Sequence, residues 1–159
     1  MTPPDPLAPR KTPVRSQPRV IALIAHDNKK QDLVEWGRFN LATLRRHHLV
    51  ATGTTGGILE RDLGLKVEKL KSGPMGGDQQ IGARIVEGGV DLVIFFWDPM
   101  SPHPHDVDVK ALLRIAVLYN IPMACNRSTA DFVISSTILS KPYEPVVKDF
   151  GSYIDRSMP

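Results

Sequence analysis

The chain has 159 residues, of which 42% are hydrophobic and 23% charged, so it is long enough for one compact domain with a buried core. Its net charge of +3 does not indicate nucleic-acid binding, because four of its 20 basic residues fall at or before position 19. No apolar run approaches the roughly 20 residues of a membrane span, and no apolar signal-peptide core is present. A single cysteine, Cys125, excludes an internal disulfide. We therefore expect a cytoplasmic protein that binds neither nucleic acid nor membrane.

The first 18 residues differ from the rest in composition. They hold six of the fourteen prolines and almost no side chain able to pack. We predict a disordered, proline-rich extension over 1–18 and a single folded domain over 19–159.

From position 19 onward, short apolar runs alternate with amphipathic segments. The apolar runs are rich in β-branched residues and predict buried parallel strands at Val20–Ala25, Leu49–Ala51, Val67–Leu70, Asp91–Trp97 and Met123–Cys125. Helical spacing predicts helices at Lys30–Arg46, Gly56–Leu63, Gln79–Gly88 and Val107–Asn120, with two more near Ser128–Ser136 and Asp149–Arg156. This alternation predicts an α/β fold: one doubly wound domain with a mainly parallel five-stranded sheet.

Two loops at predicted strand ends suggest a phosphate site. Thr52–Gly57 is made of threonines and glycines, whose hydroxyl and backbone N–H groups can face an anion at the start of a helix. Such a loop alone is equally compatible with an ordinary turn. The second loop, Ser72–Gln80, also carries glycines and adds a carboxylate, Asp78. One loop could hold the anion while the other presents a base.

Polar residues also follow the first and fourth predicted strands. His26, Asp27 and Lys30 come after the first strand, and Asp98 comes after the fourth. Since the carboxyl ends of parallel strands share one edge of the sheet, these side chains should converge with the two loops. Asp98 is equally well explained as a turn residue that bonds backbone N–H groups.

The segment after Asp98 contains two histidines and two aspartates. They are His103, His105, Asp106 and Asp108. One of the aspartates is expected to cap the next helix. The spacing, interrupted by prolines, matches none of the usual zinc patterns, so no metal site is predicted. His47 and His48 lie between a basic helix end and a strand, where we expect histidine to help cap the helix dipole, and we assign them no chemistry. We expect Cys125, Trp36 and Trp97 to serve packing.

Together these motifs resemble the methylglyoxal synthase family. The resemblance runs from about Val20 to the C-terminus and is carried by Ala25-His26-Asp27 with Lys30, Ala51–Gly56, Ser72–Gln80, Phe95–Pro99, Pro104–Arg114 and Asn120-Ile121-Pro122. It implies an enzyme that converts dihydroxyacetone phosphate to methylglyoxal and inorganic phosphate. It further implies that no cofactor or metal is used, that phosphate inhibits, and that the protein is a cytoplasmic homohexamer.

The resemblance also implies a role for each candidate residue. Asp78 would be the base, His105 would polarise the carbonyl, and Asp27 and Asp108 would orient these groups. His26 would lie at the hydroxyl end of the substrate. The phosphate would be bound by Lys30, Thr52, Gly53, Thr54, Thr55, Ser72 and Gly73, and by Arg156 reaching over from a neighbouring subunit.

Two other functional classes are compatible with the motifs. A non-catalytic effector-binding module of the same fold, similar to the effector domain of carbamoyl phosphate synthetase, would need the phosphate loop but no base. A metal-dependent phosphatase or aldolase would instead use the His/Asp cluster. Asp78 together with His105 and Asp108 favours the metal-free lyase.

Overall fold

The computed structural model describes residues 18–102, 106–148 and 150–151. The predictions made for the extension over 1–17, for His103, for His105 and for Arg156 lie outside the described residues. So does most of the helix expected near Asp149–Arg156.

A parallel sheet of five strands forms the centre of the domain. Its strands are β1 Val20–Ala25, β2 His48–Ala51, β3 Val67–Lys69, β4 Leu92–Phe96 and β5 Met123–Ala124. They are arranged in the order β3-β2-β1-β4-β5, and every neighbouring pair is parallel. The predicted fold class is confirmed, and the predicted strands are recovered with end shifts of one residue.

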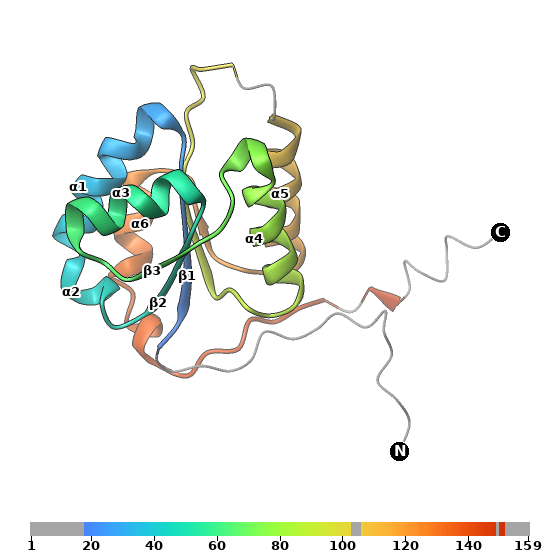
Figure 1. The fold of residues 1–159 in the computed structure, drawn as a ribbon. Coiled ribbons are helices and arrows are strands. Elements are labelled where there is room, and N and C mark those ends of the chain that lie inside the picture. The colour runs from blue at the N-terminus through green and yellow to red at the C-terminus, as the bar shows by residue number, and fades with distance from the viewer. Residues whose placement is uncertain (1–17, 103–105, 149, 152–159) are drawn as a thin grey trace.

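Helices cover both faces of this sheet (Figure 1). One layer is made of α1 Lys30–Phe39, α2 Leu41–Leu44, α3 Gly53–Leu63 and α6 Arg127–Ile134; the other is made of α4 Gly77–Val86 and α5 Asp106–Leu118. Short 3-10 helices lie at η1 Asp27–Lys29, η2 Gly73–Met75 and η3 Thr137–Ser140.

The side chains of β1 show how the sheet divides the core in two. Leu23 packs with the layer of α1, α3 and α6, whereas Ile24 packs with that of α4 and α5. Both side chains are almost fully buried, because successive residues of a strand point to opposite faces and both faces are covered. Trp36 of α1 adds a polar tie, since its indole N–H donates to the Asp131 carboxylate of α6 at 3.0 Å.

Several helix boundaries differ from prediction by one to three residues, and one predicted helix is divided. The expected helix Lys30–Arg46 is interrupted at Asn40 (φ −107°, ψ 19°), whose side-chain amide donates to the Trp36 carbonyl. Helix α3 begins at Gly53 rather than Gly56, and α4 begins at Gly77 rather than Gln79. Gly53, Thr54 and Thr55 are therefore first-turn residues of α3, with Thr52 as the N-cap. In the second motif Gly77 opens α4 and Gly76 is its N-cap, whereas Gly73 lies in η2.

Two side chains assigned to packing behave differently from each other. Trp36 is buried as predicted, but Trp97 is 42% exposed, so its assignment to the packed core was wrong. Trp97 directly follows the last residue of β4 at the edge of the sheet, where the helical layers no longer cover it. Cys125 is half-buried, and burial raises the pKa of its thiol, which agrees with the packing role assigned to it.

Arg19 fastens the segment after α6 to the start of β1. Its guanidinium donates to the backbone carbonyls of Ile138, Leu139 and Lys141, which follow or belong to η3. No helix in the described part of the chain has the length and apolar character needed to cross a membrane.

Candidate active site

The order in which the chain adds strands to the sheet reverses between β1 and β4. The chain moves from β1 to β2 and β3 on one side, and then returns to β4 and β5 on the other. Connections leave β1 and β4 toward opposite sides, so a crevice opens between their carboxyl ends. His26 follows β1 and Asp98 follows β4, and the two meet in this crevice, where the Asp98 backbone N–H donates to His26 Nδ1 at 3.0 Å.

A cavity of about 240 Å³ occupies this edge of the sheet. It brings together nine of the predicted site residues: His26, Asp27, Lys30, Thr52, Thr54, Thr55, Ser72, Gly73 and Asp78. Ile24, Ala25 and Pro74 complete its lining. Gly53 is adjacent, as the first residue of α3.

The phosphate-binding candidates gather at the start of α3. Thr54 and Thr55 lie in its first turn, where backbone N–H groups have no carbonyl one turn earlier to bond. Thr52 and Thr55 are buried, and their hydroxyls lie 3.4 Å apart. A helix start of this kind, with hydroxyl donors beside it, suits a phosphate dianion.

Lys30 brings a positive charge to the same cavity. Its ammonium group donates to the Ala25 carbonyl at 3.0 Å and to the Asp27 carboxylate at 2.7 Å, and its side chain is only 15% exposed. The Asp27 side chain is 95% exposed and lies at the cavity rim. The Lys30 side chain is therefore held in place by burial of its methylene groups and by the hydrogen bond to the Ala25 carbonyl. Its exposed ion pair with Asp27 contributes little to stability.

The two glycine loops lie against each other with almost no space between them. A Cβ atom added at Gly77 would lie 2.0 Å from the Lys71 carbonyl oxygen and 2.9 Å from Thr52 Cγ2. One added at Gly53 would lie 2.9 Å from the Leu70 carbonyl oxygen. The Gly53 N–H also donates to the Lys71 carbonyl at 3.2 Å, so it is used between the loops rather than offered to an anion.

Asp78 occupies the first turn of α4 and is buried, with 4% of its surface exposed. It lines the cavity described above and also a neighbouring hollow of about 250 Å³ between α4 and α5. Asp108, in the first turn of α5, lines that second hollow. The structure thus brings Asp108 to the side of Asp78, although not into the cavity that holds the hydroxyl groups.

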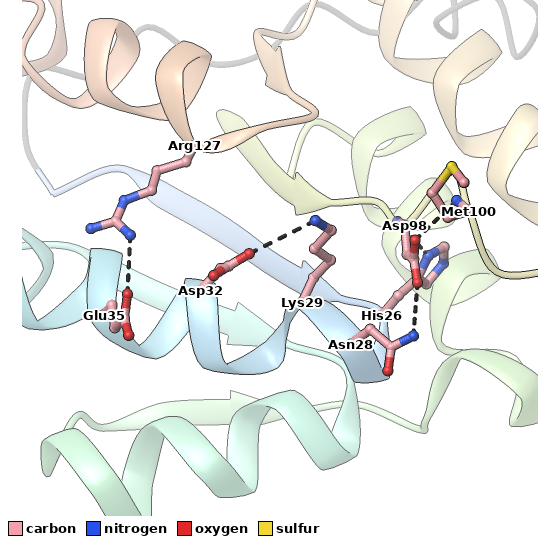
Figure 2. A network of polar contacts seen from close by, with 8 residues as sticks. All are labelled: His26, Asn28, Lys29, Asp32, Glu35, Asp98, Met100 and Arg127. Atoms are coloured by element: carbon pink, nitrogen blue, oxygen red, sulfur yellow. Dashed lines mark hydrogen bonds and ion pairs between the residues drawn. The ribbon is translucent and has the colours of Figure 1, made fainter.

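Asp98 accepts a backbone N–H bond within its own turn, as the turn-residue interpretation predicted. One carboxylate oxygen accepts the backbone N–H of Met100, and the other accepts the side-chain amide of Asn28, both at 3.0 Å (Figure 2). Sequence reasoning missed Asn28. Its position between Asp27 and Lys30 was the available signal, but nothing in the sequence pairs it with a residue 70 positions away.

A larger hollow of about 670 Å³ lies at the opposite edge of the sheet, lined in part by Arg45, Arg46, His47 and Lys66. Helices of a parallel α/β domain end at that edge, so basic side chains there complement free carbonyls. Burial and the neighbouring Arg46 lower the pKa of His47, which accepts the Arg19 N–H through Nδ1. His47 therefore has a structural role, in which it accepts a hydrogen bond from the backbone of Arg19.

Among the described residues, no three His, Cys, Asp or Glu side chains gather closely enough to hold a metal ion. His103 and His105 are outside that set, so the absence of a metal site stays a prediction.

The fold and the cavity define a doubly wound α/β protein with a cavity, lined by hydroxyl groups, a lysine and a buried carboxylate, at the carboxyl ends of its strands. A family model described as an MGS-like domain matches residues 32–125. The chain is 58% identical over 138 residues to a methylglyoxal synthase of Cellvibrio japonicus, covering 87% of this chain and 90% of that relative. It is 59% identical over 134 residues to a methylglyoxal synthase of Saccharophagus degradans, covering 84% of this chain and 87% of that relative.

A solved structure agrees with these sequence matches. The crystal structure of methylglyoxal synthase from Elizabethkingia anophelis superposes with a TM-score of 0.85 at 48% identity, covering 92% of this chain and 98% of that one. The chain belongs to the methylglyoxal synthase family, and the predicted resemblance is confirmed.

The contact between the two loops yields a test of how the site is built. We expect Gly77→Ala to push the Lys71 backbone away from Thr52, because the new methyl group has no space. Inorganic phosphate binding, measured by calorimetry, should weaken by about tenfold or more, in line with the sensitivity of such sites to small displacements.

Gly82→Ala is the matched control in the same helix. A Cβ at Gly82 meets nothing within 4 Å, so this change should leave phosphate binding intact and raise the melting temperature slightly. Equal phosphate affinity in the two variants would contradict the proposed role of the loop contact.

Proposed function

We propose that this protein is a lyase that converts dihydroxyacetone phosphate to methylglyoxal and inorganic phosphate. The observation that carries the proposal is the meeting, in one cavity, of a buried carboxylate with a helix start, hydroxyl donors and a lysine. The methylglyoxal synthases to which the chain is 58% and 59% identical favour this enzyme over an effector-binding module.

The chemistry needs a base, donors for an oxyanion and a site for the leaving phosphate. Asp78 takes a proton from the hydroxyl-bearing carbon next to the carbonyl, and the electron pair moves onto the carbonyl oxygen to form an enediolate. A proton then passes from the terminal hydroxyl to the oxygen of the former carbonyl, so that the negative charge lies on the terminal oxygen. That oxygen forms the aldehyde C=O bond, the C=C electron pair shifts toward the phosphate-bearing carbon, and phosphate leaves with the electron pair of its C–O bond. The enol left behind gains a proton at carbon and becomes methylglyoxal.

The remaining residues serve the two ends of the substrate. Lys30, Thr52, Thr54, Thr55, Ser72 and Gly73 bind the phosphate group and accept the charge it carries away. His26 and His105 donate to the oxygens of the enediolate, a role like that of the neutral histidine in triosephosphate isomerase, an established example. Asp27 and Asp108 orient Lys30 and Asp78 respectively.

We propose further that the enzyme is a cytoplasmic homohexamer that needs no metal or cofactor. Arg156 of one subunit would reach the phosphate site of its neighbour. The support for this assembly is the family membership, since the described residues belong to one chain.

Replacement of the base is the direct test of the mechanism. Asp78→Asn keeps the shape of the side chain and removes its basicity, so phosphate release from dihydroxyacetone phosphate should fall by about 10²–10⁴-fold. Binding of a phosphate-bearing inhibitor should survive. Asp62→Asn, at an exposed site on α3, is the control and should leave turnover unchanged. Near-normal turnover of Asp78→Asn would refute the assignment.

The second test concerns metal and product. A lysine, hydroxyls and backbone N–H groups can neutralise a phosphate without a cation, so activity should survive exhaustive chelation. Inorganic phosphate should compete for the same donors and raise the substrate concentration needed for half-maximal rate. Strict dependence on added zinc or magnesium would instead support a metal-dependent phosphatase or aldolase.

The third test concerns the subunit boundary. A guanidinium offers paired donors to phosphate oxygens and could report the occupancy of one site to the next. Arg156→Ala should therefore leave the oligomer intact by sedimentation yet weaken phosphate inhibition or its cooperativity. A fully active monomeric wild type, or an unchanged phosphate response in the variant, would remove Arg156 from the site.

A further inference from the structure

We infer that Asn28 is a positioning residue, whose side-chain amide holds Asp98 and thereby keeps His26 aligned toward the substrate. The inference rests on the proposed function, because the alignment matters only if His26 acts on a substrate. Asn28 lies in η1, between the candidate residues Asp27 and Lys30.

The first step is the contact across the crevice. Asn28 Nδ2 donates to Asp98 Oδ2 at 3.0 Å, which ties η1 to the loop that follows β4 (Figure 2). Asp98 is 5% exposed, and its other oxygen accepts the Met100 N–H at 3.0 Å. Each carboxylate oxygen thus has a donor, one from η1 and one from the segment that follows β4. A bond from a donor to a charged, buried acceptor is stronger than one between neutral groups.

The second step leads from Asp98 to His26. The Asp98 N–H donates to His26 Nδ1 at 3.0 Å, so in the neutral ring the proton is on Nε2. The ring also packs edge-on against Phe95, with centroids 5.1 Å apart. His26 is buried and lines the cavity, and its orientation therefore depends on where the Asp98 backbone lies.

The third step is the chemistry that this position requires. A carboxylate only accepts hydrogen bonds, so its partner must donate, and the amide of Asn28 does so without adding charge next to a phosphate site. An aspartate here has the same shape but would place a second carboxylate about 3 Å from Asp98. An alanine would leave Asp98 with one fewer donor.

The experiment compares steady-state kinetics of three variants on dihydroxyacetone phosphate. We expect Asn28→Ala to lower kcat by about tenfold with KM within twofold of wild type, because orientation is lost while the phosphate donors stay in place. Asn28→Asp should lower kcat further at pH 8 and recover part of it near pH 5.5, where one carboxyl of the pair is protonated and can donate. The matched control is Asp32→Asn, which removes an exposed 3.9 Å ion pair to Lys29 one turn along and should change neither constant.

If Asn28 only filled space in a turn, Asn28→Asp would keep a higher kcat than Asn28→Ala at pH 8. The isosteric Asn28→Asp would then match wild type, and that result, or an unchanged kcat in Asn28→Ala, overturns the inference. A rise in KM alone for Asn28→Asp would also overturn it, since that indicates charge repulsion of the substrate.

Nitrogen NMR of the histidine ring separates this inference from the proposed function. Wild type should show His26 with its proton on Nε2, and Asn28→Asp at pH 8 should shift or broaden both ring nitrogens, whereas Asp32→Asn should not. Those shifts without any phosphate release by wild type would refute the proposed reaction and support the positioning contact. Identical ring spectra in wild type and Asn28→Asp would refute the contact itself.

Discussion

The pairing of β1 with β4 is the constraint on which the site depends. Five residues of each strand are in parallel register, from Ile21 opposite Leu92 to Ala25 opposite Phe96. Both strands end at the same level, and the chain leaves them toward opposite helical layers. The carboxyl ends are therefore open to a ligand at this one point, and the polar residues that follow each strand meet there.

Rigidity at the site comes from backbone contacts as much as from side chains. Leu70 donates its N–H to the Ala51 carbonyl, and Gly53 and Gly77 make close approaches to the backbone of 70–72. The starts of α3 and α4 are thus fixed relative to each other. A donor array and a carboxylate on two different helices keep a constant separation, which is what preorganised catalysis requires.

Much of this arrangement could be predicted from the sequence, because short β-branched runs identify buried parallel strands well. The predicted starts of α3 and α4 lie two or three residues too late in the sequence, since Gly53, Thr54 and Thr55 have poor helix propensity and look like loop residues. Packing between the loops outweighs that propensity. The partnership of Asn28 with Asp98 is a long-range contact, and a single sequence holds no signal for it.

The exposure of Trp97 has a practical consequence. The protein contains two tryptophans, and they report on different places. Trp36 of α1 is buried, with its indole N–H bonded to Asp131 of α6, whereas Trp97 is 42% exposed and directly precedes Asp98, whose backbone N–H donates to His26. Emission from Trp97 should respond to events at the mouth of the site while that of Trp36 tracks the integrity of the core. The native chain thus carries its own pair of optical probes, one for ligand binding and one for unfolding.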